Sequence, residues 1–135
     1  MKAIFNVNGD AREMHPIVRD EVYLIGYEAI RNAHAHSAAG RIDVTLTYAK
    51  DLSLSVRDNG IGIDSVIAEA GKDGHFGLSS MRERAARIGG RLRIQTSANR
   101  GTEIKIVIPG SLAFGRPRPS PLDKVKTIFD WGNKN

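Results

Sequence analysis

A stripe of apolar residues at helical spacing near the N-terminus sets the first requirement on the fold. Its members recur at steps of four, three, four and four residues: Val18, Val22, Ile25, Ala29 and Ala33. This spacing places all five side chains on one side of a helix, so the period predicts an amphipathic helix over residues 16–36. Such a helix needs an apolar surface to pack against, and the rest of the chain must supply it.

The other apolar residues follow two patterns. Alternating or short apolar segments predict strands at residues 3–7, 42–48, 52–56, 92–94 and 104–108. A second helical stripe comprises Leu78, Met81, Ala85 and Ile88 and ends at two glycines. The order β-α-β-β-α-β-β predicts a two-layer α/β sandwich, with the helices packed on one face of a mostly antiparallel mixed sheet.

Length and composition exclude several classes of protein. A chain of 135 residues is one domain by length. It contains no cysteine, which excludes disulfides, a thiol nucleophile and cysteine-ligated metal sites. No apolar run approaches the eighteen residues or so of a membrane helix, and the N-terminus lacks a signal-peptide core. We therefore expect a cytoplasmic domain; a membrane anchor on a longer parent would leave no trace here.

Charge is unevenly distributed along the chain. The net charge is +5, yet residues 1–81 carry 8 basic and 11 acidic side chains, whereas residues 82–110 carry 7 and 2. A basic nucleic-acid-binding domain, a solvated basic surface and a region facing the phosphates of a small ligand all fit this distribution. The motifs described next favour the small ligand.

The C-terminal part differs in composition from the rest. Prolines, glycine and arginines concentrate around residues 110–121, which is typical of a linker. We expect a catalytic or binding domain over residues 1–110 and a tail over residues 111–135, with a short helix at 121–131. Another short helix is expected at 64–70.

Two polar residues occupy strand positions where the alternation of apolar and polar residues predicts an apolar side chain facing the core. Asp58 keeps the parity of the apolar residues in 52–56, and Thr102 keeps that of 104–108. A carboxylate on the core side of a sheet is costly without a donor, and no neighbour in sequence offers a fixed one. Asp58 therefore either caps the turn after its strand or receives a hydrogen bond from a ligand.

Glu28 and Asn32 form a second polar pair, at the edge of the first helical stripe. They are four residues apart, so they lie about 40° apart around the helix. A carboxamide and a carboxylate can hold a hydrated Mg²⁺ that also binds phosphates, and the carboxylate can accept a proton. Taken singly, the pair fits an exposed glutamate and a helix-surface asparagine better than a metal site.

A glycine-rich segment, residues 71–80, runs into the second predicted helix. The N–H groups and the dipole at a helix N-terminus favour phosphate. The segment is not a Walker loop, because the required Gly-Lys-Ser/Thr spacing is absent. By itself it is a weak indication of a phosphate site.

Together these segments, in this order, resemble the ATP-binding catalytic domain of bacterial sensor histidine kinases, within the GHKL superfamily. The resemblance covers roughly residues 15–110. Residues 28–33 resemble the N box, 58–62 the G1 box and 101–103 the last box, while 74–84 resemble the G2 segment of short-lid kinases that pair with LuxR-type response regulators. The resemblance implies the Bergerat fold, with ATP and Mg²⁺ as ligands.

The resemblance also implies a role for individual residues at the adenine. Asp58 would accept a hydrogen bond from the adenine amino group, which supplies the donor that its inward position lacks. Gly60 and Gly62 would let the base lie close to the backbone. Thr102 would bond near the adenine edge through water.

At the phosphates, Asn32 would ligate Mg²⁺ and Glu28 would be the catalytic base or polariser. His36 lies four residues beyond Asn32 and would assist at the phosphates. The other residues implied there lie at the glycine-rich segment and the start of the next helix: Gly74, His75, Gly77 and Leu78.

Two departures from the family pattern keep other interpretations open. Ala35 stands where related kinases often have Arg or Lys facing phosphate, and Ser80 stands where they usually have glycine. An inactive nucleotide-binding scaffold therefore remains an alternative. So do another GHKL module, such as an anti-sigma-type serine kinase or an ATP-gated switch, and a basic nucleic-acid-binding domain that uses no nucleotide.

The partners also follow from the resemblance. Histidine kinases phosphorylate a histidine on a separate dimerising helical hairpin, and only about fifteen residues precede the first helix here. We expect the hairpin of the parent or of a partner kinase to act in trans, with little turnover by this chain alone. A response regulator would act downstream. We expect a monomer that contacts neither nucleic acid nor membrane.

Overall fold

The computed structural model describes residues 1–36, 38–62, 77–97 and 100–114. The elements in chain order are β1 (Lys2–Asn8), α1 (Pro16–His36), β2 (Arg41–Tyr48), β3 (Leu52–Asp58), α3 (Leu78–Arg87), β4 (Arg91–Ser97), β5 (Gly101–Ile108) and α4 (Gly110–Ala113). Both helical stripes and all the predicted strands are confirmed. The helices predicted at 64–70 and 121–131 lie outside the described residues.

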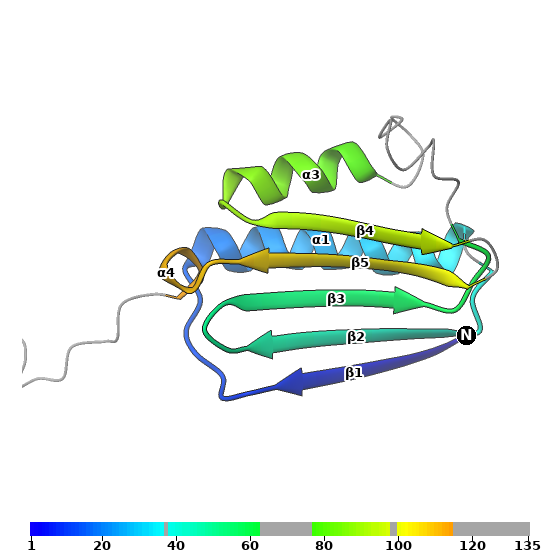
Figure 1. The fold of residues 1–135 in the computed structure, drawn as a ribbon, viewed down its shortest axis with the longest axis horizontal. Coiled ribbons are helices and arrows are strands. Elements are labelled where there is room, and N and C mark those ends of the chain that lie inside the picture. The colour runs from blue at the N-terminus through cyan, green and yellow to red at the C-terminus, as the bar shows by residue number, and fades with distance from the viewer. Residues whose placement is uncertain (37, 63–76, 98–99, 115–135) are drawn as a thin grey trace, which may run out of the picture.

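The described strands form one sheet in the order β1-β2-β3-β5-β4. β1 pairs parallel with β2, and the other neighbouring pairs are antiparallel. α1 and α3 lie side by side on one face of the sheet, and the other face carries no helix of the described part (Figure 1). The predicted two-layer arrangement is therefore confirmed.

The core lies between the helices and the sheet. All five members of the first stripe are buried on α1, and Leu78, Met81 and Ala85 are buried on α3. On the sheet, the register aligns apolar side chains in cross-strand rows, for example Val44, Val56, Ile104 and Ile94. This burial stabilises the domain because transfer of such side chains from water is favourable by about 1.5–3 kcal/mol each.

The packed unit continues past residue 110, where the sequence suggested a linker. α4 begins there, Ala113 and Phe114 are buried, and the Phe114 ring stacks on Tyr48 with 6.2 Å between centroids. The His15 N–H donates to the Ala113 carbonyl at 2.9 Å, so this segment is tied to the start of α1. The linker interpretation is wrong for residues 110–114. The remainder of the tail lies outside the described residues.

The helices of the described part of the chain are α1, α3 and α4. None of them is long and apolar enough to cross a bilayer.

Candidate functional site

The elements that carry the predicted site residues meet at one end of the molecule. The C-terminal end of α1, the end of β3, the start of α3 and the start of β5 all lie at the right-hand end of the view in Figure 1. They are separated by long stretches of sequence, and the pairing of β3 with β5 brings two of them into contact.

The sheet changes from apolar to polar at this end. Beyond the row that contains Val56 and Ile104, the next cross-strand row is Ile42, Asp58, Thr102 and Thr96. Asp58 and Thr102 are buried, as their strand parity predicts. The hydroxyl groups of Thr96 and Thr102 lie 3.0 Å apart, within hydrogen-bond distance. Polar side chains are unusual on the side of a sheet that faces the core, so this row is a candidate ligand-binding site.

Asp58 is partly satisfied by the protein itself. The Gly60 N–H donates to Asp58 Oδ1 at 2.8 Å, so the carboxylate does cap the turn after its strand. The expectation that no nearby residue supplies a donor is therefore wrong. Burial raises the pKa of Asp58 above its ordinary value of 3.8, while hydrogen bonds from the backbones of Gly60 and Thr102 oppose that rise. A carboxylate has about four acceptor positions, so these two backbone donors leave capacity for a ligand donor.

Two glycines let three strand ends approach one another. Gly62 has φ +85°, and a Cβ there would lie 2.5 Å from the Ser97 carbonyl oxygen. Gly101 has φ +95°, and a Cβ there would collide with the Asp58 carbonyl oxygen. Both positions need glycine for backbone packing as well as for a positive φ. Gly60 is buried in the same turn.

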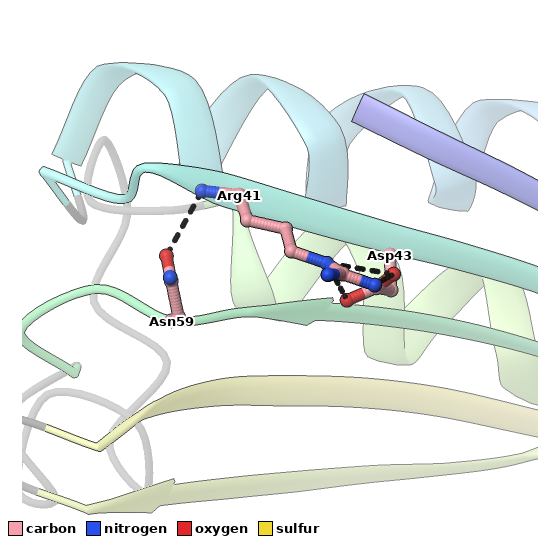
Figure 2. Close-up of polar contacts among 3 residues, drawn as sticks. All are labelled: Arg41, Asp43 and Asn59. Carbon is pink, nitrogen blue, oxygen red and sulfur yellow. Dashed lines mark hydrogen bonds and ion pairs between the residues drawn. The ribbon is translucent and has the colours of Figure 1, made fainter. Parts of the chain in front are cut away.

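Asn59 anchors the turn from the other side. Its Oδ1 accepts hydrogen bonds from the N–H groups of Gly40 and Arg41, both at 2.9 Å. Figure 2 shows the bond from Arg41 to Asn59 beside the ion pair of Arg41 with Asp43. This ion pair lowers the pKa of the Asp43 carboxyl, chiefly through a side-chain hydrogen bond. The loop after Asp58 is thus fixed to the start of β2. Sequence reasoning did not assign Asn59 this role.

A cavity of about 660 Å³ opens at the polar row. Its described lining includes Asp58, Ile94, Thr96, Gly101 and Thr102. Its volume falls within the range of about 300–1,000 Å³ typical of small-molecule sites.

The helix residues form the other part of the site. Asn32 is buried, and the Glu28 side chain is 32% exposed with Arg31 3.8 Å away. Gly77 precedes α3 with φ 58°, and a Cβ there would lie 3.1 Å from Glu28 Oε2. The start of α3 is therefore packed against Glu28. Leu78 follows as a fully buried residue that ties this end of α3 to the core.

The structure brings together some predicted residues and not others. Asp58, Gly60 and Thr102 share one row and turn, and Glu28 meets Gly77, but neither Glu28 nor Asn32 lines the cavity. Gly74, His75 and the side chain of His36 lie outside the described residues. In the described ranges, no group of three or more His, Cys, Asp or Glu residues could hold a metal ion. Asn32, Asp58 and Thr102 are the only buried polar residues of the described part.

The raised pKa of Asp58 makes stability depend on pH. Below the ordinary pKa of 3.8, Asp58 is protonated in both the folded and the unfolded state, and its contribution to the free energy of unfolding is complete. This contribution is lost as the pH rises through the higher pKa of the folded state. Asp58→Asn removes this dependence. As the pH rises from about 4 to about 7, we expect the melting temperature of the wild type to fall relative to that of the variant. Thermal melts at several pH values measure this. A difference in melting temperature between the two proteins that does not change with pH would contradict the prediction.

Comparisons with known proteins place the chain in a family. The family described as histidine kinase-, DNA gyrase B-, and HSP90-like ATPase matches residues 17–112. The sensor histidine kinase LiaS of Bacillus subtilis is 37% identical over 95 residues, which cover 68% of this chain and 25% of LiaS. The kinase/phosphatase DegS of the same bacterium is 34% identical over 115 residues, or 83% of this chain and 30% of DegS. The chain spans less than a third of these relatives.

Solved structures share the fold. The histidine kinase domain of the Erythrobacter litoralis EL346 blue-light activated kinase has a TM-score of 0.65 at 24% identity, covering 81% of this chain and 55% of that one. The catalytic domain of histidine kinase ThkA has a TM-score of 0.60 at 21% identity, covering 80% and 78%. At these identities the likeness concerns the fold. The predicted resemblance to histidine kinase ATP-binding domains is confirmed.

Proposed function

Because this chain belongs to the family of histidine kinase-, DNA gyrase B- and HSP90-like ATPases, we propose that it binds Mg-ATP and supplies the catalytic module for histidine phosphorylation in two-component signalling. One observation carries the proposal. The buried polar residues of the described part, Asn32, Asp58 and Thr102, are residues to which the resemblance assigns contacts with magnesium and adenine. Buried polar side chains are uncommon in a protein core, so a ligand site at this end of the molecule explains their retention.

Adenine would bind in the cavity at the polar row. Asp58 accepts the Gly60 N–H on one oxygen, which leaves acceptor capacity on the carboxylate for the amino group of the base. Thr102, already within hydrogen-bond distance of Thr96, would act near the edge of the ring through water. Ile94 on the lining supplies an apolar contact for the flat face of the base.

The phosphates would extend toward α1 and α3. Asn32 would provide one oxygen to Mg²⁺, which ordinarily keeps waters and binds the rest of its shell through phosphates. Gly77 and the first turn of α3 would face the phosphates with backbone N–H groups. Glu28, in contact with Gly77, would accept or polarise the proton of the attacking group.

The reaction would move the γ-phosphoryl group from ATP to a histidine on the helical hairpin of the parent or of a partner kinase. The bond from phosphorus to the bridging oxygen of ADP breaks, and a bond to an imidazole nitrogen forms. Glu28 would accept the imidazole proton, and ADP would be the leaving group. Positioning and charge neutralisation account for most of the catalysis in such transfers. A response regulator would then receive the phosphoryl group.

Calorimetry with the full chain tests the metal role directly. We expect the wild type to bind ATP several-fold more tightly with Mg²⁺ than with EDTA, and Asn32→Ala to lose that difference, because the amide oxygen no longer completes the metal shell. His34→Ala, at an exposed position on the same helix, serves as the control and should keep the difference. A wild type that does not bind nucleotide at millimolar concentration would overturn the proposed function.

A further inference from the structure

Glu21 joins α1 to α3 away from the cavity. Its Oε2 lies 3.1 Å from Arg84 Nη1, and its Oε1 lies 3.9 Å from Arg87 Nη1. The side chains of Glu21 and Arg84 are only 14% and 28% exposed, so water screens this contact less than it screens the surface ion pairs. The 3.1 Å contact is a charge-assisted hydrogen bond, which is directional as well as strong.

This ion pair lies on the same seam as the contact between Glu28 and Gly77. Glu21 and Glu28 are seven residues apart on α1, and Gly77 and Arg84 are seven residues apart from the start of α3 onward. Seven residues span about 10.5 Å along an α-helix, close to two turns, so both contacts fall on matching sides of the two helices. The partners occur in opposite chain order, which makes the helices antiparallel along this seam.

The apolar contacts along the seam define this register less sharply. The buried residues of α3 include Leu78 and Met81, and those of α1 include Val22 and Ile25, all of them apolar. Apolar burial has no preferred direction, whereas a charge-assisted hydrogen bond does. A directional ion pair two turns from Gly77 therefore restrains the sliding of α3 along α1. Sliding would move the first turn of α3 away from Glu28.

We propose that Glu21 and Arg84 are positioning residues, which hold α3 in the register that presents its first turn to the phosphates of ATP. The inference rests on the proposed function and deepens it. Neither residue lines the cavity at the polar row. Loss of the ion pair between Glu21 and Arg84 should therefore weaken the binding of the phosphates and leave the adenine contacts unchanged.

The test compares ATP with adenosine, which lacks the phosphates. In calorimetric and NMR titrations of the full chain, we expect Glu21→Gln and Arg84→Gln each to weaken ATP binding by about tenfold, because each removes the charge-assisted hydrogen bond that holds α3 in register. Adenosine affinity should stay within about twofold of the wild type, since Asp58 and Thr102 are untouched. Arg87→Gln is the control, because Arg87 is 60% exposed and farther from Glu21.

Two further variants separate positioning from a loss of folding. The double variant Glu21→Gln/Arg84→Gln should bind ATP no more weakly than either single variant, because the two changes remove one interaction. Arg84→Lys keeps the charge and should recover most of the ATP affinity. Unchanged ATP binding in the single variants, or equal losses for ATP and adenosine, would overturn this inference alone. A wild type that binds no ATP would overturn the proposed function as well.

Discussion

Asp58→Asn is expected to abolish ATP binding while the protein stays folded. The asparagine has one acceptor oxygen and one amide nitrogen in place of two acceptor oxygens. If its oxygen accepts the Gly60 N–H, as Asp58 Oδ1 does at 2.8 Å, the NH₂ group faces the amino group of adenine. If the side chain flips, the NH₂ group faces the Gly60 N–H instead. Either orientation places two donors against each other in a buried site.

The expected loss is large because a buried donor without an acceptor costs its full desolvation. We expect ATP affinity to fall by at least about a hundredfold, in line with about 1–3 kcal/mol for the unpaired donor plus the lost charge-assisted bond. Calorimetry with ATP measures this, and far-UV circular dichroism checks the fold. Asp43→Asn is the matched control, since it removes the same charge from a side chain that pairs with exposed Arg41. Wild-type affinity in Asp58→Asn would refute the adenine contact.

The second large effect is expected for Gly101→Ala, which should destabilise the whole domain. Gly101 starts β5 with φ +95°, and an added Cβ would overlap the Asp58 carbonyl oxygen. The unfavourable φ alone costs about 1–3 kcal/mol in a residue other than glycine. The overlap is with backbone, which cannot rotate away, so β5 must separate from the end of β3. Because these strands pair through Asp58 and Thr102, the polar row should be displaced with them.

Thermal melting measures this effect, and we expect the melting temperature to fall by about 10 °C or more. Gly40→Ala is the control, because a Cβ there meets no atom within 4 Å and its φ is not positive. It should melt close to the wild type. Equal melting temperatures for Gly101→Ala and the wild type would mean that β5 does not approach Asp58 as the structure places it.

Much of the architecture was predictable because hydrophobic periodicity is a local signal. The stripe from Val18 to Ala33 located α1, and alternation located the strands and the face that each side chain occupies. Parity alone placed Asp58 and Thr102 toward the helices, where both are buried. The order of the glycine and polar segments also sufficed for the resemblance to histidine kinase ATP-binding domains, which the family match confirms. The roles of individual site residues remain predictions.

The tail shows where local patterns mislead. Glycine and prolines after residue 109 are typical of a linker, yet Phe114 is buried against Tyr48 beneath the Arg12 guanidinium, 4.0 Å from the ring centroid. Residues 112–114 form an apolar segment too short to show a periodicity that would indicate its burial. The partners of the Phe114 ring lie more than sixty residues away in the chain, so only the folded structure could place it in the core.

The sequence by itself determined which residues form helices and strands, and which faces turn inward, because those depend on the spacing of neighbours. Only the tertiary structure decided that β5 lies between β3 and β4, which sets Thr102 beside Asp58, and that Gly101 packs on the Asp58 backbone. The seam on which Glu21 meets Arg84 was equally beyond the sequence. Such contacts join residues that are far apart in the chain, and their partners are selected by the packing of the whole core rather than by any local pattern.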